Sequence, residues 1–320
     1  MLRTRTPPRF TVLFWLVWFC ILPKLGKAQS KTVPEPHEVH IAMKNVMYHY
    51  TGPIAVHIVQ LQGELVPNKV GSIVVFDDKN SFTIAMVSAE IAISCTALAQ
   101  VLNEDVFSAA DAPIKAVTIE SKNNRLVIRG KFHQKKDVPF ETIGTVSANG
   151  DGRIRLHSEH VKAAHLPVKG IMDLLGLDLA RLINTNKVQG IAVDKDDLII
   201  DPQQILPAPR IRGKVTAVQI QGNDIVQVFG SERDPHPAPK QAGNFISLRD
   251  GEVRFGKLTM RDSDIVMVDL DEQDPFDFYI DHYQQQLIAG YTKTTPELGL
   301  RVYMRDFSKL NSRSPRVAAR

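Results

Sequence analysis

Residues 114–132, IKAVTIESKNNRLVIRGKF, carry two apolar stretches of strand length on either side of Asn123 and Asn124. Asparagine tolerates the positive φ angles that a tight turn between antiparallel strands requires. The stretch therefore predicts a β-hairpin with strands at residues 114–120 and 125–132, and an antiparallel sheet around it.

Similar patterns recur on both sides of this hairpin. A second hairpin is predicted at residues 140–157, where the connecting residues 149–152 read Asn-Gly-Asp-Gly. Turn residues at 222–224 and 249–251 predict two more hairpins. The other strands are predicted where apolar residues alternate or form short runs: 54–61, 73–76, 82–94, 191–200, 215–221, 225–229, 245–248, 253–255 and 265–268.

Three segments have helical rather than strand periodicity. Residues 97–106 place Leu98, Val101, Leu102 and Val106 on one face, and Ser94 or Thr96 can cap this helix. Residues 169–184 predict a second helix. Because no alternating β-α units occur, the fold class predicted from these elements is α+β with a mostly antiparallel sheet.

The third helix is predicted near the end of the chain. Asp274 can cap it, Pro275 suits its first turn and Gly290 can end it. Its apolar stripe would consist of Phe276, Tyr279, Ile280, Tyr283 and Leu287.

The first 28 residues predict a secretory signal. Three arginines precede a thirteen-residue, mainly apolar run at 10–22, and small residues precede an expected cut after Ala28. At about 1.5 Å per residue this run covers roughly 20 Å, less than the about 30 Å core of a bilayer. We therefore expect a periplasmic or otherwise extracytoplasmic protein. An uncleaved signal anchoring the chain to the inner membrane is the alternative.

Loss of the signal changes the charge balance. The whole chain has 39 Lys and Arg against 35 Asp and Glu, and the signal contains five of the basic residues and no acid. The remainder has a net charge near −1, which gives no electrostatic reason to expect nucleic acid as a partner.

The composition divides the exported part into four segments. Residues 37–230 form the main α+β domain, and the proline-bearing residues 231–243 predict a stiff linker. Residues 244–307 predict a C-terminal region of a β-hairpin and a helix, which either extends the sheet or forms a separate module. The basic residues 308–320 predict a disordered tail.

No catalytic motif stands out, so neither an enzyme nor a cofactor is expected. Phosphate loops, nucleophile elbows and paired Cys-x-x-Cys or His-Glu-x-x-His motifs are absent from the sequence. An acidic run does occur, and carboxylates are the ligands that calcium prefers, but its spacing matches no calcium loop. We assign no metal site and leave calcium binding open. The run consists of Asp262, Asp264, Asp269, Asp271, Asp274, Asp277 and Asp281.

The helix predicted at 169–184 has more apolar surface than one core face needs. Leu175 and Leu179 lie on its main apolar face, whereas Leu174 and Leu177 lie behind it among charged residues. Such a second patch requires cover from another protein layer, from an apolar ligand or from a membrane surface. A helix break at Gly176 that resets the phase would also explain it.

The stretch from 82 to 230 resembles the LmeA-type phospholipid-binding family of bacterial envelopes. The resemblance implies a strongly curved, mostly antiparallel sheet wrapped around two helices, with an apolar groove for acyl chains. It lies in loose hydrophobic patterns and does not extend to residues 244–307. The patterns are the strand and leucine helix at 87–102, Arg125-Leu126-Val127-Ile128, Gly152-Arg153-Ile154-Arg155-Leu156, Leu166-Pro167-Val168, Asp201-Pro202, Leu206-Pro207, Ile211-Arg212-Gly213 and Val226-Gln227-Val228-Phe229-Gly230.

Together these observations predict an exported, non-enzymatic protein that binds a phospholipid or another amphipathic ligand. The residues expected to line the groove are Leu98, Val101, Leu102, Leu174, Leu175, Leu177 and Leu179. Candidates for a headgroup phosphate, by sign and position, are Arg153, Arg155, Arg210 and Arg212.

The alternative is a structural or adaptor protein of the envelope. Its C-terminal region would bind a protein partner, with Phe278 and the basic tail as contact surface.

Overall fold

The computed structural model describes residues 38–133, 137–164, 166–168, 189–195, 197–230 and 240–312. The predicted signal, the second helix at 169–184, residues 231–239 of the linker and the end of the tail lie outside these residues. Antiparallel strands dominate the described part, as the sequence predicts, and helices are few. None of the described helices is long and apolar enough to cross a membrane.

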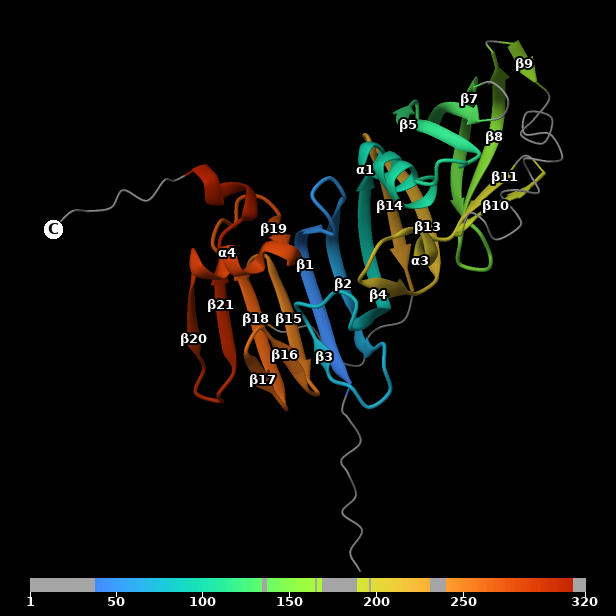
Figure 1. Cartoon of the computed structure of the whole chain (residues 1–320). Helices are drawn as coiled ribbons and strands as arrows, with labels where there is room; N and C mark the ends of the chain where they lie inside the picture. The colour runs from blue at the N-terminus through green and yellow to red at the C-terminus, as the bar shows by residue number, and fades with distance from the viewer. Residues whose placement is uncertain are drawn as a thin grey trace, which may run out of the picture. The chain divides into compact units, whose positions relative to one another are not determined.

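The largest sheet has eleven strands and takes strands from both ends of the chain (Figure 1). Two of them lie off the main path: β12 (Arg210–Arg212) pairs with β4, and β19 (Phe276–Tyr279) pairs with β1. The main path runs through β13 (Val215–Gln221), β14 (Asp224–Phe229), β4 (Phe82–Ser94), β2 (Ala55–Pro67), β1 (Val39–His49), β15 (Phe245–Asp250), β18 (Ser263–Asp269), β21 (Leu300–Met304) and β20 (Tyr291–Thr294).

Strand β4 covers the residues that the sequence predicts, but β1 was not predicted from the sequence. Its apolar residues are interrupted by His40, Lys44 and Asn45, and Asn45 has a φ of 51°, which breaks the alternation. The sheet nevertheless places β1 centrally, between β2 and β15. Residues 244–307, for which two arrangements were open, thus continue the sheet beyond β1.

The second sheet contains the hairpins predicted at residues 114–132 and 140–157, and the one predicted around residues 222–224 is β13–β14 of the first sheet. Asn123 and Asn124 have φ angles of 52° and 59°, as a type I′ turn requires, so the sequence-based prediction of this hairpin is confirmed. Its seven strands are β5 (Ile114–Lys122), β6 (Arg125–His133), β7 (Asp137–Ala148), β8 (Ile154–Ala163), β9 (Leu166–Val168), β10 (Ile191–Asp194) and β11 (Asp197–Ile200).

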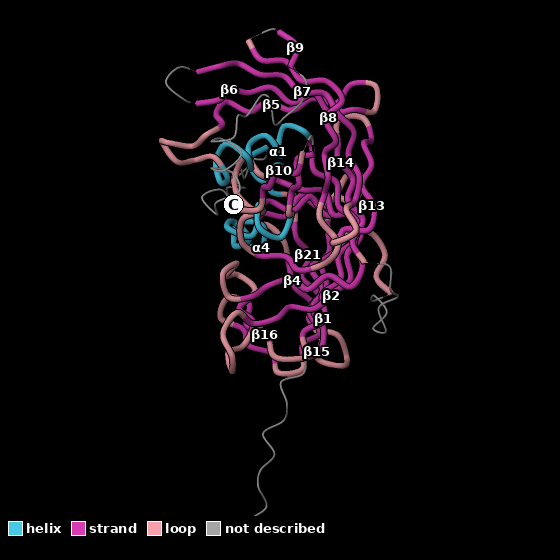
Figure 2. Tube along the Cα trace, turned by 90° about the vertical axis from the view of Figure 1, so that its right-hand side faces the viewer, coloured by secondary structure: helices cyan, strands magenta, loops and turns pink. Residues whose placement is uncertain are grey.

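A short helix between the sheets begins two residues before the predicted segment 97–106, directly after Ser94, one of its two predicted caps. Helix α1 (Cys95–Val101) is capped by Ser94, whose hydroxyl accepts a hydrogen bond from the Ala97 N–H. A π-helical turn, Leu102–Val106, continues it and ends with the Phe107 N–H bonded to the Leu102 carbonyl. Helix α1 packs against β4 of the first sheet and β5 of the second (Figure 2). A second short helix, α3 (Pro202–Ile205), follows β11.

The hairpin predicted between residues 245–248 and 253–255 is wrong. Strand β15 is already hydrogen-bonded on both sides, by β1 and β18, so it has no free edge for the following strand. Asp250 and Gly251, both with positive φ, lead the chain into a separate small sheet. That sheet consists of β3 (Val74–Val75), β16 (Val253–Phe255) and β17 (Leu258–Met260).

The first part of the helix predicted at 274–290 is also wrong. Residues 276–279 form β19, which pairs in parallel with Val46–His49 of β1. A 3₁₀ turn, Ile280–His282, and the short helix α4 (Tyr283–Ile288) follow. Phe276 and Phe278 are fully buried, so Phe278 is not the exposed contact residue of the predicted adaptor surface. Long-range pairing with β1 outweighs the local helical pattern here.

The chain continues past Phe307 as a 3₁₀ helix, Phe307–Ser312. This helix occupies the first residues of the predicted disordered tail. The fold prediction is confirmed in its coarse part, mostly antiparallel sheets with few helices, whereas one sheet wrapped around two helices is not confirmed, because there are two large sheets and the second predicted helix lies outside the described residues.

Candidate functional site

The main candidate site is an apolar cavity between the two large sheets. It has a volume of about 90 Å³, and the atom-free space among its lining residues, including space open to solvent, is about 1100 Å³. The lining comes from α1, the π-helical turn, α3, strands of both sheets and the segments between them: Ile93, Leu98, Leu102, Phe107, Ile114, Val117, Ile119, Leu126, Ile128, Phe132, Phe140, Thr142, Val146, Ile154, Leu156, Ile191, Leu198, Ile200, Pro202, Ile205, Leu206, Ile225 and Gln227.

Strand alternation explains why this lining is apolar. Every second residue of a strand faces the same side, and the residues of β6 and β8 that line the cavity are apolar. Strand β5 departs from simple alternation because its register shifts between Lys115 and Thr118, with Ala116 at a φ of 52°. Val117 lies within this shift, so Ile114 and Val117 both reach the cavity.

Asn103 holds the irregular part of β5 against the π-helical turn. Its amide donates to the Val117 carbonyl and its side-chain oxygen accepts from the Val117 N–H, both at 2.8 Å. The two polar backbone groups of Val117 are thus satisfied by one side chain. This contact fixes one wall of the cavity relative to α1.

The structure places two of the predicted groove residues in this lining. Leu98 and Leu102 contact the cavity, whereas Val101 is fully buried and does not line it. Leu174, Leu175, Leu177 and Leu179 lie outside the described residues. The strand residues that form most of the lining were not predicted, although their alternation was a usable signal.

None of the four predicted headgroup arginines lines the cavity. Arg153 pairs with Asp151, and Arg155 lies 3.6 Å from a carboxylate oxygen of Asp197. Arg210 donates to the carbonyl oxygens of Gln204 and Leu206, at 3.1 and 2.8 Å, and Arg212 is exposed on β12. Along the chain, Arg153 and Arg155 flank the lining residue Ile154, and Arg210 contacts the lining through the Leu206 carbonyl.

The charged residues around Arg210 are of both signs. Burial and the neighbouring Glu104 raise the pKa of Asp105, and the charge of Arg210 opposes that rise. The surroundings of Arg210 are therefore not uniformly basic.

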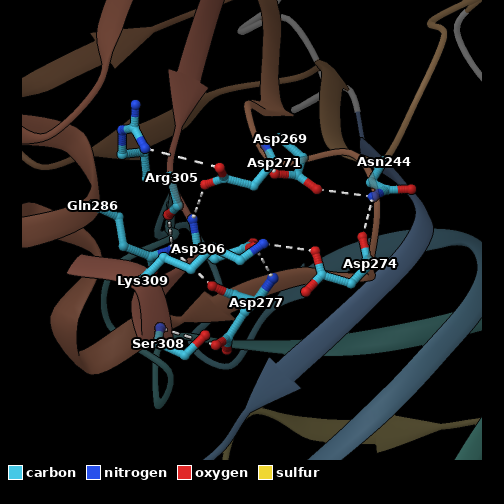
Figure 3. A network of polar contacts seen from close by, with 10 residues as sticks. All are labelled: Asn244, Asp269, Asp271, Asp274, Asp277, Gln286, Arg305, Asp306, Ser308 and Lys309. Atoms are coloured by element: carbon cyan, nitrogen blue, oxygen red, sulfur yellow. Dashed lines mark hydrogen bonds and ion pairs between the residues drawn. The ribbon is translucent and has the colours of Figure 1, made fainter. Parts of the chain in front are cut away.

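A second candidate site, this one polar, lies near the C-terminal end of the described chain, away from the cavity lining. Asp269, Asp271 and Asp306 each place a carboxylate oxygen within 4.8 Å of the others (Figure 3). Two of them belong to the acidic run seen in the sequence, and Asp306 was not predicted. Within the described part of the chain, these three residues are the ones that could hold a cation.

The carboxylates of this cluster already have protein partners. Asp269 accepts hydrogen bonds from the Asn244 amide at 2.8 Å and from the Asp271 N–H at 2.7 Å. Asp306 lies 2.7 Å from the Lys309 ammonium and accepts from the Asp277 N–H. Burial raises the pKa of Asp269 to about 6, and it also raises the pKa of Asp306. These contacts form a network that links β19 and the last 3₁₀ helix to the rest of the first sheet.

Two other members of the acidic run are paired elsewhere, Asp264 with Arg301 and Asp281 with Lys79. Asp277 pairs with His49 and joins the cluster only through its N–H bond to Asp306. The run therefore does not form one site.

No family model matches the chain, and no match was found among curated proteins or among solved structures. The resemblance to LmeA-type proteins rests on the sequence patterns alone.

Proposed function

We propose that this chain is an exported, non-enzymatic envelope protein that binds a lipid or another amphipathic molecule in the cavity between its sheets. The observation that carries the proposal is the lining: among the described residues, every lining residue apart from Thr142 and Gln227 is apolar. Each buried methylene contributes about 0.8 kcal/mol, so such a wall can bind a hydrocarbon segment without catalytic groups. Export rests on the predicted signal.

The size of the cavity limits what it can enclose. Sites for drug-sized ligands measure about 300–1,000 Å³. A cavity of about 90 Å³ encloses only a few methylene groups, and the rest of an acyl chain would extend into the space open to solvent. The ligand's polar headgroup would then remain outside, where basic residues such as Arg210 lie.

The test is the lipid content of the purified protein. Organic extracts analysed by mass spectrometry should contain an amphipathic molecule in a fixed ratio to protein. Val146→Phe, which adds bulk to the lining, should lower that ratio several-fold. Val138→Phe is the matched control, because Val138 is a partly buried residue of the same strand outside the lining. A wild-type protein that is consistently empty would contradict the proposal.

An adaptor is the second candidate, and one feature of the C-terminal region favours it. Strand β20 is the last strand in the order of its sheet, all four of its residues are exposed, and the apolar side chains of Ile288, Tyr291 and Leu298 are exposed around it. Exposed edges and apolar side chains are typical of protein contacts. Serine at these three positions should release a protein partner without changing lipid content if the chain is an adaptor.

A further inference from the structure

One polar side chain in the cavity wall has no hydrogen-bond partner among the described residues. Gln227 lies on β14, where it pairs through its backbone with Val218 and Ile91. Its side chain lines the cavity and the residue is 8% exposed. Its carboxamide makes no hydrogen bond to any residue in the described part of the chain.

The position is unusual for a glutamine because its face of the strand is otherwise apolar. Ile225, Gln227 and Phe229 alternate on one side of β14, and Ile225 also lines the cavity. The other polar lining residue, Thr142, has a hydrogen-bond partner, because its hydroxyl donates to the Ser158 hydroxyl at 3.0 Å. Gln227 is therefore the polar lining residue whose hydrogen-bonding capacity is unused by the described chain.

A carboxamide has two N–H donors and an oxygen with two lone pairs. The carboxamide is not sealed from solvent, so water can reach it while the cavity is empty. A purely apolar ligand that displaces this water leaves the carboxamide unsatisfied, which is costly, whereas a ligand that bonds to it avoids this cost. A charged ligand group does not suit the site, because the lining residues in the described part of the chain include no Lys, Arg, Asp or Glu to compensate its charge.

We infer that the ligand carries a neutral hydrogen-bonding group, such as a hydroxyl, carbonyl or amide, within its apolar portion, and that Gln227 binds this group. The inference rests on the proposed function and names the ligand class for the same cavity: an oxygen-bearing hydrocarbon rather than a plain one. A site built to bond a polar group discriminates against analogues that lack it.

The test compares 1-hexanol with 1-chlorohexane, which have equal numbers of non-hydrogen atoms but differ in hydrogen bonding. Binding is measured by the fall in headspace concentration of each compound above the full-length protein. In Gln227→Met, a variant of similar side-chain length without the amide, we expect affinity for 1-hexanol to fall roughly 3- to 10-fold. Affinity for 1-chlorohexane should stay the same or rise.

Ile225→Val is the matched control, because it shortens a lining residue on the same strand. Ile225→Val should lower the affinity for both compounds by a similar factor. Far-UV circular dichroism and the thermal midpoint show whether each variant is folded, and Gln227→Asn serves as the second variant if Gln227→Met is not.

The outcomes separate the two proposals. If both compounds bind wild type and Gln227→Met changes both equally or neither, the role of Gln227 is wrong and the cavity remains a binding site. If neither compound binds wild type, the proposed function fails, and the inference fails with it.

Discussion

Asp269 and Asp306 show at the scale of single residues how burial changes acid chemistry. Each residue is 1% exposed and close to another carboxylate. Burial disfavours the charged form, and for Asp269 it outweighs the hydrogen bonds from Asn244 and Asp271 that favour the charge. The pKa of Asp269 is therefore about 6 in the folded state, above its usual value of 3.8.

This raised pKa predicts a stability that falls as pH rises. Between about pH 3.8 and 6 the unfolded chain has lost the proton that folded Asp269 still holds, so deprotonation favours unfolding. The full contribution is no more than about 3 kcal/mol. In urea titrations from pH 4.5 to 6.5, Asp269→Asn should show a less negative slope of unfolding free energy against pH than wild type.

Asp277 and His57 also change stability with pH, and their effects have to be separated from that of Asp269. Burial acts to raise the pKa of Asp277, but the net shift is downward, chiefly because of the hydrogen bond from His49. The stabilising contribution of Asp277 is therefore lost only as pH falls below about 3.8. Burial lowers the pKa of His57 from 6.5, which makes stability rise with pH in this range in both proteins. Only the difference between wild type and variant reports Asp269, and equal slopes would contradict the prediction.

At the scale of elements, a glycine at a bulge determines how β7 pairs with β8. The register shifts between Ile143 and Gly144, and a Cβ at Gly144 would lie 2.1 Å from the His157 carbonyl oxygen. Real Cβ atoms do not approach backbone oxygen so closely, so one of the two strands would have to move. Several lining residues of the cavity lie on these strands.

Gly144→Ala should therefore lower the free energy of unfolding by about 2–4 kcal/mol, measured by denaturant titration. Gly150→Ala is the control, because no atom lies within 4 Å of a Cβ at that position in the turn between the same strands. It should change stability by less than about 0.5 kcal/mol. Equal effects of both substitutions would show that the close approach is not what requires glycine.

Elements also show where local patterns mislead. Phe276, Tyr279, Ile280 and Tyr283 have helical spacing, yet the first two belong to a strand. A parallel partner 230 residues away in sequence, Val46 opposite Phe276, decides the outcome. Periodicity within one segment contains no information about such a partner.

At the scale of the whole molecule, β1 joins the two ends of the described chain. It pairs with β15 from His40 opposite Arg249 to Lys44 opposite Phe245, and it also pairs with β2 and β19. Removing residues 244–307 would leave one edge of β1 unpaired and expose apolar residues of β1 such as Tyr48, whose ring contacts Phe278.

A single cut in the proline-bearing residues 231–239, made through an inserted protease site, should therefore leave both fragments associated. We expect them to co-elute in size-exclusion chromatography under native conditions and to separate in denaturant. A control with the same inserted site, left uncut, should elute at the same volume. Separation into two folded fragments under native conditions would show that the C-terminal region is an independent module.

The sequence by itself determined the features that depend on neighbouring residues. Turn residues such as Asn123 and Asn124 defined the first hairpin, Ser94 marked the start of α1, and alternation identified β4 with both its ends. Steric limits on φ and bonds to nearby backbone groups act within a few residues, so they can be predicted from a short stretch.

Only the tertiary structure decided what depends on distant residues. It paired β1 with β15 and β19, brought Asp306 to Asp269 and Asp271, and placed the amide of Gln227 in an apolar wall built from two sheets. A strand has two edges and two faces, and which segments occupy them is decided by the packing of the whole chain.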